Sequence, residues 1–419
     1  MSSNNFAMMA RVRGDVSAEQ VREALRQIPA RHPAMVTVRG ADAQQLDPVG
    51  PEFPLTEYLN AGENDWIEVV QNELAHSFTR ERPYARFMLL KHGEHFDLVG
   101  VFHHHVCEGM SGMYIMRDIL QVLGNPQTPL LPFALPKMPN ELMPASVVNN
   151  DAFQDKVKKT LRDLRWGLWV EKMRRRAFPQ TMAAAPVEDE TLVNQFVLFP
   201  VQFTVEQTRA LAERCKAEGV SVHAALCVAW LWALIDQTDG EKPKGGAVSS
   251  PVNLRNRLSS PVDETAGQFL AIVETYIDYE PGADFWEQTR VFKQRFIDAT
   301  TDEALFFRPV LFGSIFGKLP NSDARIVMSL IFSGRVKYDF SVTNLGRVPI
   351  PQQNGNLRVE AFYGPLVNSA PRERTVGVST LGGQMTLSFL FRKSKMTPEQ
   401  GRDLMDRALA ILDKVANEK

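Results

Sequence analysis

The chain has 419 residues, which is too long for one ordinary hydrophobic core and predicts two domains. Hydrophobic residues make up 44% and charged residues 23%, and the formal net charge is -2, so no general field attracts the protein to nucleic acid. The three cysteines, Cys107, Cys215 and Cys227, match neither a disulfide framework nor a zinc knuckle, which favours the cytoplasm. We recognise no signal peptide and no apolar run of the roughly 18 residues that a membrane span needs.

The first half of the chain is predicted to mix strands and helices. A strand at 6–12 precedes a helix that Ser17 caps, with Gln20 in the capping-box position. This helix should end before Pro33, because proline disfavours helix at the preceding residue. The next expected elements are a strand at 35–38, a helix around 66–74, strands at 85–90 and 96–103, a helix at 111–122, a proline-rich loop at 126–144 and a basic helix at 151–176.

The second half follows an expected linker at 178–190. It has a similar alternation of strands and helices, but the two halves show no residue-by-residue sequence repeat. Thr204, Ser221 and Thr397 are predicted to cap three helices. The expected order is a strand at 194–203, helices after 204 and 221, strands at 246–254 and 269–277, a helix at 284–300, strands at 338–344, 357–363, 375–380 and 385–391, and a helix at 398–416. The pattern predicts a mixed α/β (α+β) fold with domains at 1–177 and 191–419.

A run of three histidines, 103–105, ends an apolar strand and is the most unusual feature of the sequence. Strand side chains alternate between faces, so His104 should point away from its two neighbours and the three rings should not converge on a metal ion. A two-ligand metal site with Cys107 and a plain strand end with satisfied polar groups both stay open. A histidine on a rigid strand end also suits a general base, because its pKa lies near neutral pH.

Other catalytic signatures are missing from the sequence. The segment 109–112 has the wrong spacing for a G-x-S-x-G nucleophile turn, and no G-x-G-x-x-G occurs. The segment 313–318 is one residue too short between its glycines for a phosphate loop, and a leucine follows its lysine. We therefore expect no nucleotide binding by such loops.

The segment HHHVCEG at 103–109 resembles the H-H-x-x-x-D-G motif of a large superfamily. That superfamily contains chloramphenicol acetyltransferase, the condensation domains of nonribosomal peptide synthetases and the polyketide-associated acyltransferases. Further segments fall in the order that the family shows: RHPAM at 31–35, PVNLR at 251–255, GQF at 267–269 and SVTNLG at 341–346. The likeness is to the stand-alone polyketide-associated acyltransferases, since no carrier or adenylation module is recognisable.

The resemblance implies two chloramphenicol-acetyltransferase-like subdomains arranged in a V, with a tunnel between them. It implies that His104 is the general base. His103, Gly109 and an ion pair between Glu108 and Arg255 would hold the motif in shape. Glu108 stands where the family usually has an aspartate, and its side chain is one methylene longer.

Donors for a tetrahedral oxyanion are expected on the strand at 338–344. The hydroxyls of Ser341 and Thr343 share one face of this strand, and routine strand residues are an equally good interpretation of them. Asn344 is a candidate for the wall of the substrate tunnel, although its place before a glycine also suits a turn.

The resemblance implies an ester-forming acyltransferase of natural-product biosynthesis, transferring groups other than aminoacyl groups. The donor would be acyl-CoA or an acyl-carrier protein, and the acceptor a small-molecule alcohol or amine. We expect no metal and no separate cofactor, because CoA or phosphopantetheine arrives with the donor. A monomer without nucleic-acid partners is expected. Amide formation on a carrier-bound amine and an inactive binding protein of the same fold stay open as alternatives.

The basic helix at 151–176 carries nine lysines and arginines around Trp166 and Trp169. A solvated face is the plain interpretation. Two functional interpretations are docking of an acidic carrier protein or of CoA phosphates, and weak contact with an anionic membrane surface. Because the family uses thioester donors, the sequence favours the donor contact of these two.

Overall fold

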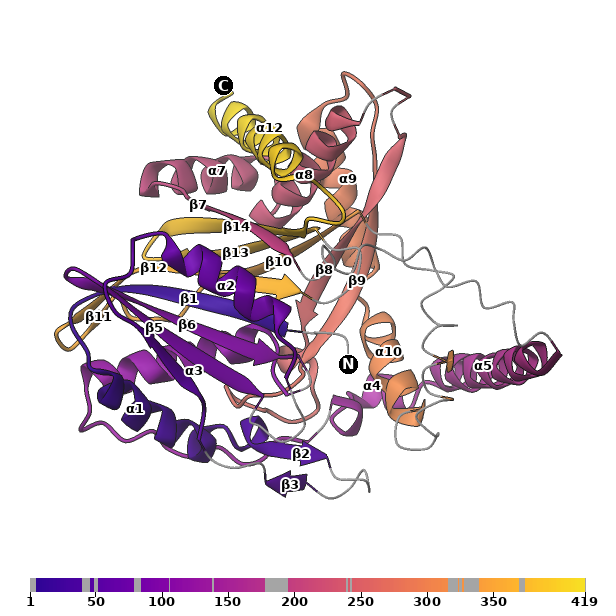
Figure 1. Cartoon of the computed structure of the whole chain (residues 1–419). Coiled ribbons are helices and arrows are strands. Elements are labelled where there is room, and N and C mark those ends of the chain that lie inside the picture. Colours follow the sequence, from indigo (N-terminus) through magenta and orange to yellow (C-terminus); the bar gives the residue numbers. More distant parts are fainter. Residues whose placement is uncertain are drawn as a thin grey trace.

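The computed structural model describes residues 5–39, 46–48, 52–78, 84–104, 106–137, 139–177, 195–238, 240–241, 243–315, 323, 326–327, 339–368 and 374–418. The expected linker at 178–190 lies outside these residues. Two six-stranded sheets form the centre of the molecule, and Figure 1 shows helices packed around them. The predicted mixed α/β fold is therefore confirmed.

The first sheet has the strand order β11-β12-β1-β6-β5-β4. Its strands from the first half are β1 (Asn5–Arg13), β4 (Leu55–Tyr58), β5 (Ala85–His92) and β6 (His95–His103), and a separate pair is β2 (Thr37–Arg39) with β3 (Leu46–Pro48). The helices of this half are α1 (Ala18–Arg31), α2 (Asp65–Ala75), α3 (Gly109–Gly124), the short α4 (Ala145–Val148) and α5 (Asp151–Ala177). The capping box of Ser17 and Gln20 is present, as predicted.

The second sheet has the strand order β7-β14-β13-β10-β8-β9. Its strands are β7 (Phe196–Gln202), β8 (Gly245–Asn253), β9 (Leu270–Asp278), β10 (Phe340–Arg347), β13 (Arg374–Leu381) and β14 (Gln384–Arg392). The helices of this half are α7 (Val205–Ala217), α8 (Val222–Gln237), α9 (Phe285–Asp298), α10 (Asp302–Ile315) and α12 (Pro398–Asn417). Thr204, Ser221 and Thr397 cap α7, α8 and α12, so these three predictions are confirmed.

Two strands from the second half of the sequence belong to the first sheet. The strands β11 (Gln353–Asn354) and β12 (Leu357–Asn368) pair with each other, and β12 pairs along β1 from Arg358 to Asn368. The same strand packs against β13 and β14 of the second sheet. A hairpin from residues 353–368 thus joins the two sheets, while the division of the chain at 178–190 stays a prediction.

Several local elements differ from the sequence predictions. Residues Pro33–Met35 form a 3-10 turn, so the strand expected at 35–38 begins at Thr37. The strands β3, β4 and β11 and the helices α4 and α10 were not predicted. The helix α10 contains Pro309, and an internal proline removes a helical hydrogen bond and argues against helix in a sequence. Packing of Leu305, Phe306 and Leu311 in the core compensates for that loss.

No single helix among the described residues is long and apolar enough to cross a membrane. The helices α7 and α8 meet the length and composition test only when taken together, and the chain bends by 100° between them.

Candidate active site

The two described histidines of the motif point in opposite directions, as the alternation of strand side chains predicts. The ring of His104 lies 4.6 Å from the ring of Phe6 on β1, centroid to centroid. The ring of His103 lies 5.3 Å from Tyr84 and 5.8 Å from Phe78. The third histidine, at 105, lies outside the described residues.

A glycine of α3 makes room for the aromatic ring that supports His104. A Cβ atom at Gly112 would lie 2.8 Å from the Phe6 ring, closer than real Cβ contacts allow. The segment 109–112, which resembles a nucleophile turn in composition, therefore serves the packing of α3 against β1. This packing places the Phe6 ring beneath His104.

Burial lowers the pKa of His104 to about 4. The positive charge that His103 can carry lowers this pKa further, while a hydrogen bond with the Cys107 backbone raises it. A carbonyl acceptor raises the pKa of a histidine because it favours the ring N–H. At neutral pH the His104 ring is therefore uncharged, with one nitrogen engaged by this backbone and the other able to accept a proton.

Glu108 is the N-cap residue of α3 and is almost completely buried. Its carboxylate accepts hydrogen bonds from the backbone N–H groups of Met110, at 2.6 Å, and of Ser111, at 3.1 Å. Anions are favoured at a helix N-terminus, where backbone N–H groups lack helical partners. The glutamate thus caps the helix as an aspartate would, in spite of its extra methylene.

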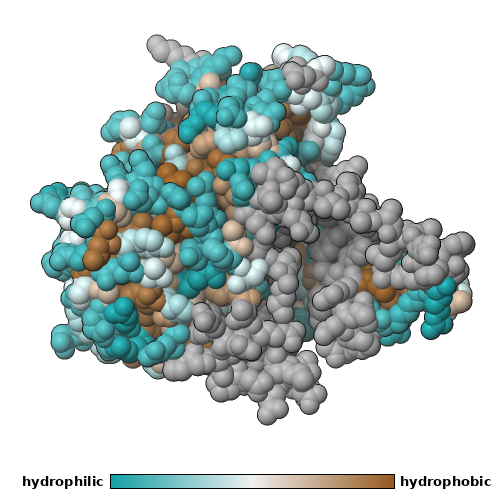
Figure 2. Space-filling view, in the orientation of Figure 1, coloured by the Kyte–Doolittle hydropathy of each residue, from teal (hydrophilic) through white to brown (hydrophobic). Residues whose placement is uncertain are grey.

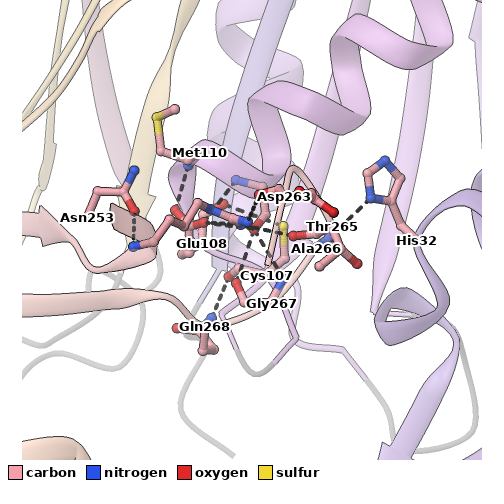
Figure 3. A network of polar contacts seen from close by, with 12 residues as sticks. His32, Cys107, Glu108, Met110, Asn253, Asp263, Thr265, Ala266, Gly267 and Gln268 are labelled. Carbon is pink, nitrogen blue, oxygen red and sulfur yellow. Dashed lines mark hydrogen bonds and ion pairs between the residues drawn. The ribbon is translucent and has the colours of Figure 1, made fainter. Parts of the chain in front are cut away.

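The ion pair expected between Glu108 and Arg255 is present. The Arg255 Nη2 lies 2.9 Å from Glu108 Oε1, and the two side chains are 6% and 4% exposed. Arg255 also donates to the carbonyls of Asp263 and Thr265, at 2.8 and 2.9 Å. Its guanidinium lies 4.6 Å from the centre of the Phe269 ring. Figure 3 shows how this network ties the motif loop to a segment far along the chain.

Ser111 connects the same two segments, although the sequence did not single it out. Its hydroxyl lies 2.8 Å from Glu108 Oε1 and 2.8 Å from Arg255 Nη2. It also lies 3.1 Å from the backbone nitrogen and 3.1 Å from the carbonyl oxygen of Gly267. A Cβ at Gly267 would lie 2.3 Å from the Phe269 ring, so a larger residue does not fit there. The serine and the glycine therefore belong to the structural part of the site.

Gln268 holds the backbone of the histidine loop directly. Its side-chain amide donates to the carbonyl of His104 and, at 2.6 Å, to the carbonyl of Cys107. The family resemblance drew attention to 267–269 as a strand segment only. Neither spacing nor composition signals this contact, because the two partners lie more than 160 residues apart in the chain.

We predict that Gln268→Ala lowers kcat by roughly tenfold, because small displacements of a catalytic group are costly. KM should change less than kcat, since Gln268 acts through the backbone of the histidine loop. Steady-state kinetics and a thermal melt would check this. The matched control is Gln384→Ala, which removes an exposed contact with Gln202 and should leave both constants unchanged. A kcat equal to that of the wild type would contradict a positioning role for Gln268.

His32, in the RHPAM segment, is a buried bridge between the two halves of the chain. Its Nδ1 accepts from the backbone N–H of Ala266 at 3.1 Å, and its Nε2 lies 3.1 Å from Asp118 Oδ2. Because Nδ1 accepts, the proton of the neutral ring is on Nε2. Burial lowers the pKa of His32, against the opposing effect of Asp118. This histidine thus holds α1 and α3 against the 263–268 segment, which lies beside it in Figure 3.

The oxyanion candidates lie on the face of β10 opposite the second core. Phe340 and Val342 point into that core, so Ser341 and Thr343 point the other way. Neither hydroxyl has a hydrogen-bond partner among the described residues. Leu345, on the same face, packs against the core of the first half.

Gly109 brings the start of α3 close to the end of β10. A Cβ at Gly109 would lie 3.1 Å from Pro365 of β12 and 3.4 Å from the side chain of Leu345. The Oδ1 of Asn344 accepts from the N–H of Gly346 at 2.7 Å, and Gly346 has a φ of +67°. Asn344 therefore shapes a bulge-like irregularity within β10 rather than the turn that the sequence suggested, and its place in a tunnel wall stays a proposal.

The described residues around the motif form no metal site. Among the described residues, no group of three or more histidine, cysteine, aspartate and glutamate side chains could hold a metal ion. Cys107 is buried, and burial raises the pKa of its thiol. A surface hollow of about 860 Å³ lies beside Arg13 and Gly93, at the end of β1 opposite the strand end that carries His103.

One known protein family matches the second half of the sequence. The sequence profile of the family described as phthiocerol/phthiodiolone dimycocerosyl transferase C-terminus matches residues 194–390. The match includes Arg255 and β10 but not the histidine motif. A comparison with curated protein sequences found no match.

Solved structures resemble the chain over nearly all of its length. The trichothecene 15-O-acetyltransferase TRI3 from Fusarium sporotrichioides has a TM-score of 0.70 at 11% identity, covering 99% of this chain and 92% of that one. The first condensation domain of the CDA synthetase gives 0.66 at 13%, with coverages of 99% and 91%. Polyketide synthase associated protein 5 from Mycobacterium tuberculosis gives 0.63 at 13%, with 99% and 94%. At identities of 11% to 13%, the structural similarity shows a shared fold and nothing further about this chain.

The profile match over residues 194–390 and the fold likeness over nearly the whole chain both agree with the superfamily of CoA-dependent acyltransferases and condensation domains. The profile match supports an acyltransferase-type function. The superfamily resemblance stated from the motif is therefore confirmed, and the roles of the individual site residues stay predictions.

Proposed function

We propose that the protein transfers an acyl group from a thioester donor, acyl-CoA or an acyl-carrier protein, to the hydroxyl of a small-molecule acceptor. His104 is the general base of this proposal. The observation that carries it is a histidine fixed at a strand end, on a loop held by the buried Glu108–Arg255 pair and by Gln268. Burial lowers the pKa of this histidine, which favours the uncharged form that a general base needs.

In the proposed reaction the acceptor hydroxyl attacks the thioester carbonyl while His104 takes its proton. The C–O bond forms, the C–S bond breaks, and the protonated histidine returns the proton to the departing thiolate. The base therefore ends each turnover in the form in which it started. No covalent acyl-enzyme is needed, because both substrates meet at one base. Ser341 and Thr343 are the proposed donors to the tetrahedral oxyanion.

The test is turnover with a panel of acyl-CoA thioesters of increasing chain length and a set of small alcohols and amines. Release of the free thiol measures cleavage, and mass spectrometry of the product distinguishes an ester from an amide. The proposal requires thiol release that depends on the acceptor and an ester product. Thioester hydrolysis without any acylated acceptor would contradict it.

Amide formation on a carrier-bound amine is the second candidate, favoured by the structural likeness to a condensation domain. An amide product, formed only when the amine is attached to a carrier protein, would establish it. Binding of the thioester without turnover of any acceptor would instead indicate an inactive protein of the same fold.

The pH dependence of kcat/KM should follow the low pKa of His104. The base is active when unprotonated, so activity is retained above the folded-state pKa of about 4 and is lost as the pH falls through it. We expect a plateau from neutral pH to about pH 5 and a tenfold fall per unit well below the pKa. Circular dichroism at each pH separates this limb from acid unfolding. A limb centred near the ordinary histidine value of about 6.5 would contradict the burial of this ring.

A further inference from the structure

The helix α5 has an apolar stripe that attaches it to the rest of the protein. Val157, Leu161, Leu164 and Leu168 follow at helical spacing and pack with residues of α10, among them Phe306, Leu311 and Ile315. In Figure 1 the C-terminal part of α5 projects away from the two sheets. One face of the helix is thus occupied by the protein itself.

A second apolar stripe lies on the opposite face of the same helix and is exposed. Trp166, Trp169, Val170 and Met173 are spaced i, i+3, i+4 and i+7, and they are 65%, 53%, 43% and 44% exposed. The rings of Trp166 and Trp169 stack at 4.9 Å. In Figure 2 a small brown area lies beside teal surface at the projecting end of the molecule. Exposed apolar patches of this kind mark interaction sites.

The exposed stripe is surrounded by positive charge. The helix carries nine lysines and arginines against four acidic residues, a net charge of +5 in a chain whose net charge is -2. Lys158 pairs with Asp155 at 3.3 Å, and Lys172 with Asp323 at 2.6 Å. The exposed cations without an acidic partner among the described residues are Lys156, Lys159, Arg162, Arg165 and Arg176.

The helical positions of these cations place them around the apolar side chains. Lys159 and Arg162 continue the exposed face toward the N-terminus of α5, while Arg165 and Arg176 lie along one flank of it. Asp155, about three turns before Trp166, is the exposed acidic residue in line with this face, and it pairs with Lys158. Asp163 lies on the other flank. The face therefore combines two tryptophans, two aliphatic side chains and an excess of cations.

We propose that α5 binds the surface of an anionic phospholipid bilayer. Trp166, Trp169, Val170 and Met173 would enter the interface between headgroups and acyl chains, where tryptophan is favoured. Arg162 and Arg165 would contact lipid phosphates, to which arginine binds through two N–H groups.

Two features favour a bilayer over an acidic protein. The apolar stripe covers two helical turns of one projecting helix, less than the roughly 800 Å² per partner of a stable protein interface. A bilayer needs no matching shape, and its attraction adds up from a few apolar side chains and separate charges. The inference is independent of the acyl-transfer proposal, because none of the residues in the Glu108–Arg255 network lies on α5.

The first experiment is cosedimentation of the full-length protein with vesicles of phosphatidylcholine mixed with phosphatidylglycerol, and with phosphatidylcholine alone. Binding should require the anionic lipid and weaken as salt rises, because surface attraction is screened over about 10 Å at 0.1 M. Brominated lipids should quench tryptophan fluorescence in the wild type and not in Trp166→Ser/Trp169→Ser. Equal binding to the two kinds of vesicle, or binding to neither, would overturn the proposal.

Charge variants separate the role of α5 from net charge. Arg162→Gln/Arg165→Gln should weaken binding to anionic vesicles by roughly thirtyfold, the effect of losing two surface cations. The matched control is Arg22→Gln/Arg209→Gln, which removes two exposed arginines from α1 and α7 and should bind as the wild type does. Equal affinity of the α5 variant and the wild type would overturn the proposal.

Apolar controls and other partners are tested with the same proteins. Ile272→Ser/Tyr276→Ser removes exposed apolar side chains from β9 and should leave vesicle binding unchanged. If Trp166→Ser/Trp169→Ser keeps its vesicle affinity but converts a dimer to a monomer in gel filtration, the partner is a second copy. If the α5 variants raise the donor KM without vesicles and keep vesicle affinity, the helix binds the thioester donor. Either result would overturn membrane binding.

Discussion

Replacing His104 by alanine should lower kcat by roughly a hundredfold or more, the usual scale for loss of a general base. The strand end and the Glu108–Arg255 network do not depend on the imidazole, so the fold should survive. The acidic limb of the pH profile, which we assign to this ring, should disappear from the residual activity. The measurements are steady-state kinetics across pH and a thermal melt of the same preparation.

The matched control for His104→Ala is His95→Ala. His95 lies at the other end of the same strand, where it pairs with Glu360 at 3.1 Å in a partly exposed position. Its removal should leave kcat within about twofold of the wild type, since surface pairs contribute little. A folded His104→Ala protein with nearly wild-type turnover would exclude this residue as the base, while the superfamily fold would stand.

Glu108→Gln should lower the free energy of unfolding by about 3 kcal/mol, because it leaves the buried Arg255 without its counter-charge. Activity should fall with stability, since the same carboxylate caps α3 and holds Ser111 beside Gly267. Chemical denaturation and turnover of the folded fraction would measure the two effects. An unchanged unfolding free energy would contradict the structural role of the pair.

Two variants calibrate the Glu108 experiment. Glu108→Asp keeps the charge and a favourable N-cap residue, and it should be tolerated better than Glu108→Gln. Glu94→Gln removes a surface partner of Arg13, in a pair whose side chains are 75% and 58% exposed, and should cost less than about 1 kcal/mol. If Glu108→Asp is as unstable as Glu108→Gln, the length of the side chain, rather than its charge, determines the stability that this ion pair contributes.

Much of this protein follows from local sequence patterns. Helix caps at Ser17, Thr204 and Thr397 depend on residues three positions apart, and the structure contains all three capping boxes. The opposite orientations of His103 and His104 follow from strand alternation alone. The pairing of Glu108 with Arg255 was expected only because the whole motif resembles a known superfamily, since 147 residues separate the two.

The tertiary structure decided the contacts that no periodicity encodes. The pairing of β12 with β1 depends on strands more than 340 residues apart, and an apolar strand sequence does not specify its neighbour. The contacts of Gln268 with the histidine loop and of His32 with Ala266 likewise depend on side chains that meet only after both halves have packed. The sequence also leaves the solvent exposure of Trp166 and Trp169 undetermined. A helix with apolar side chains on two faces can bury either one, and the packing of α10 against Leu161 and Leu168 leaves the tryptophan face in solvent.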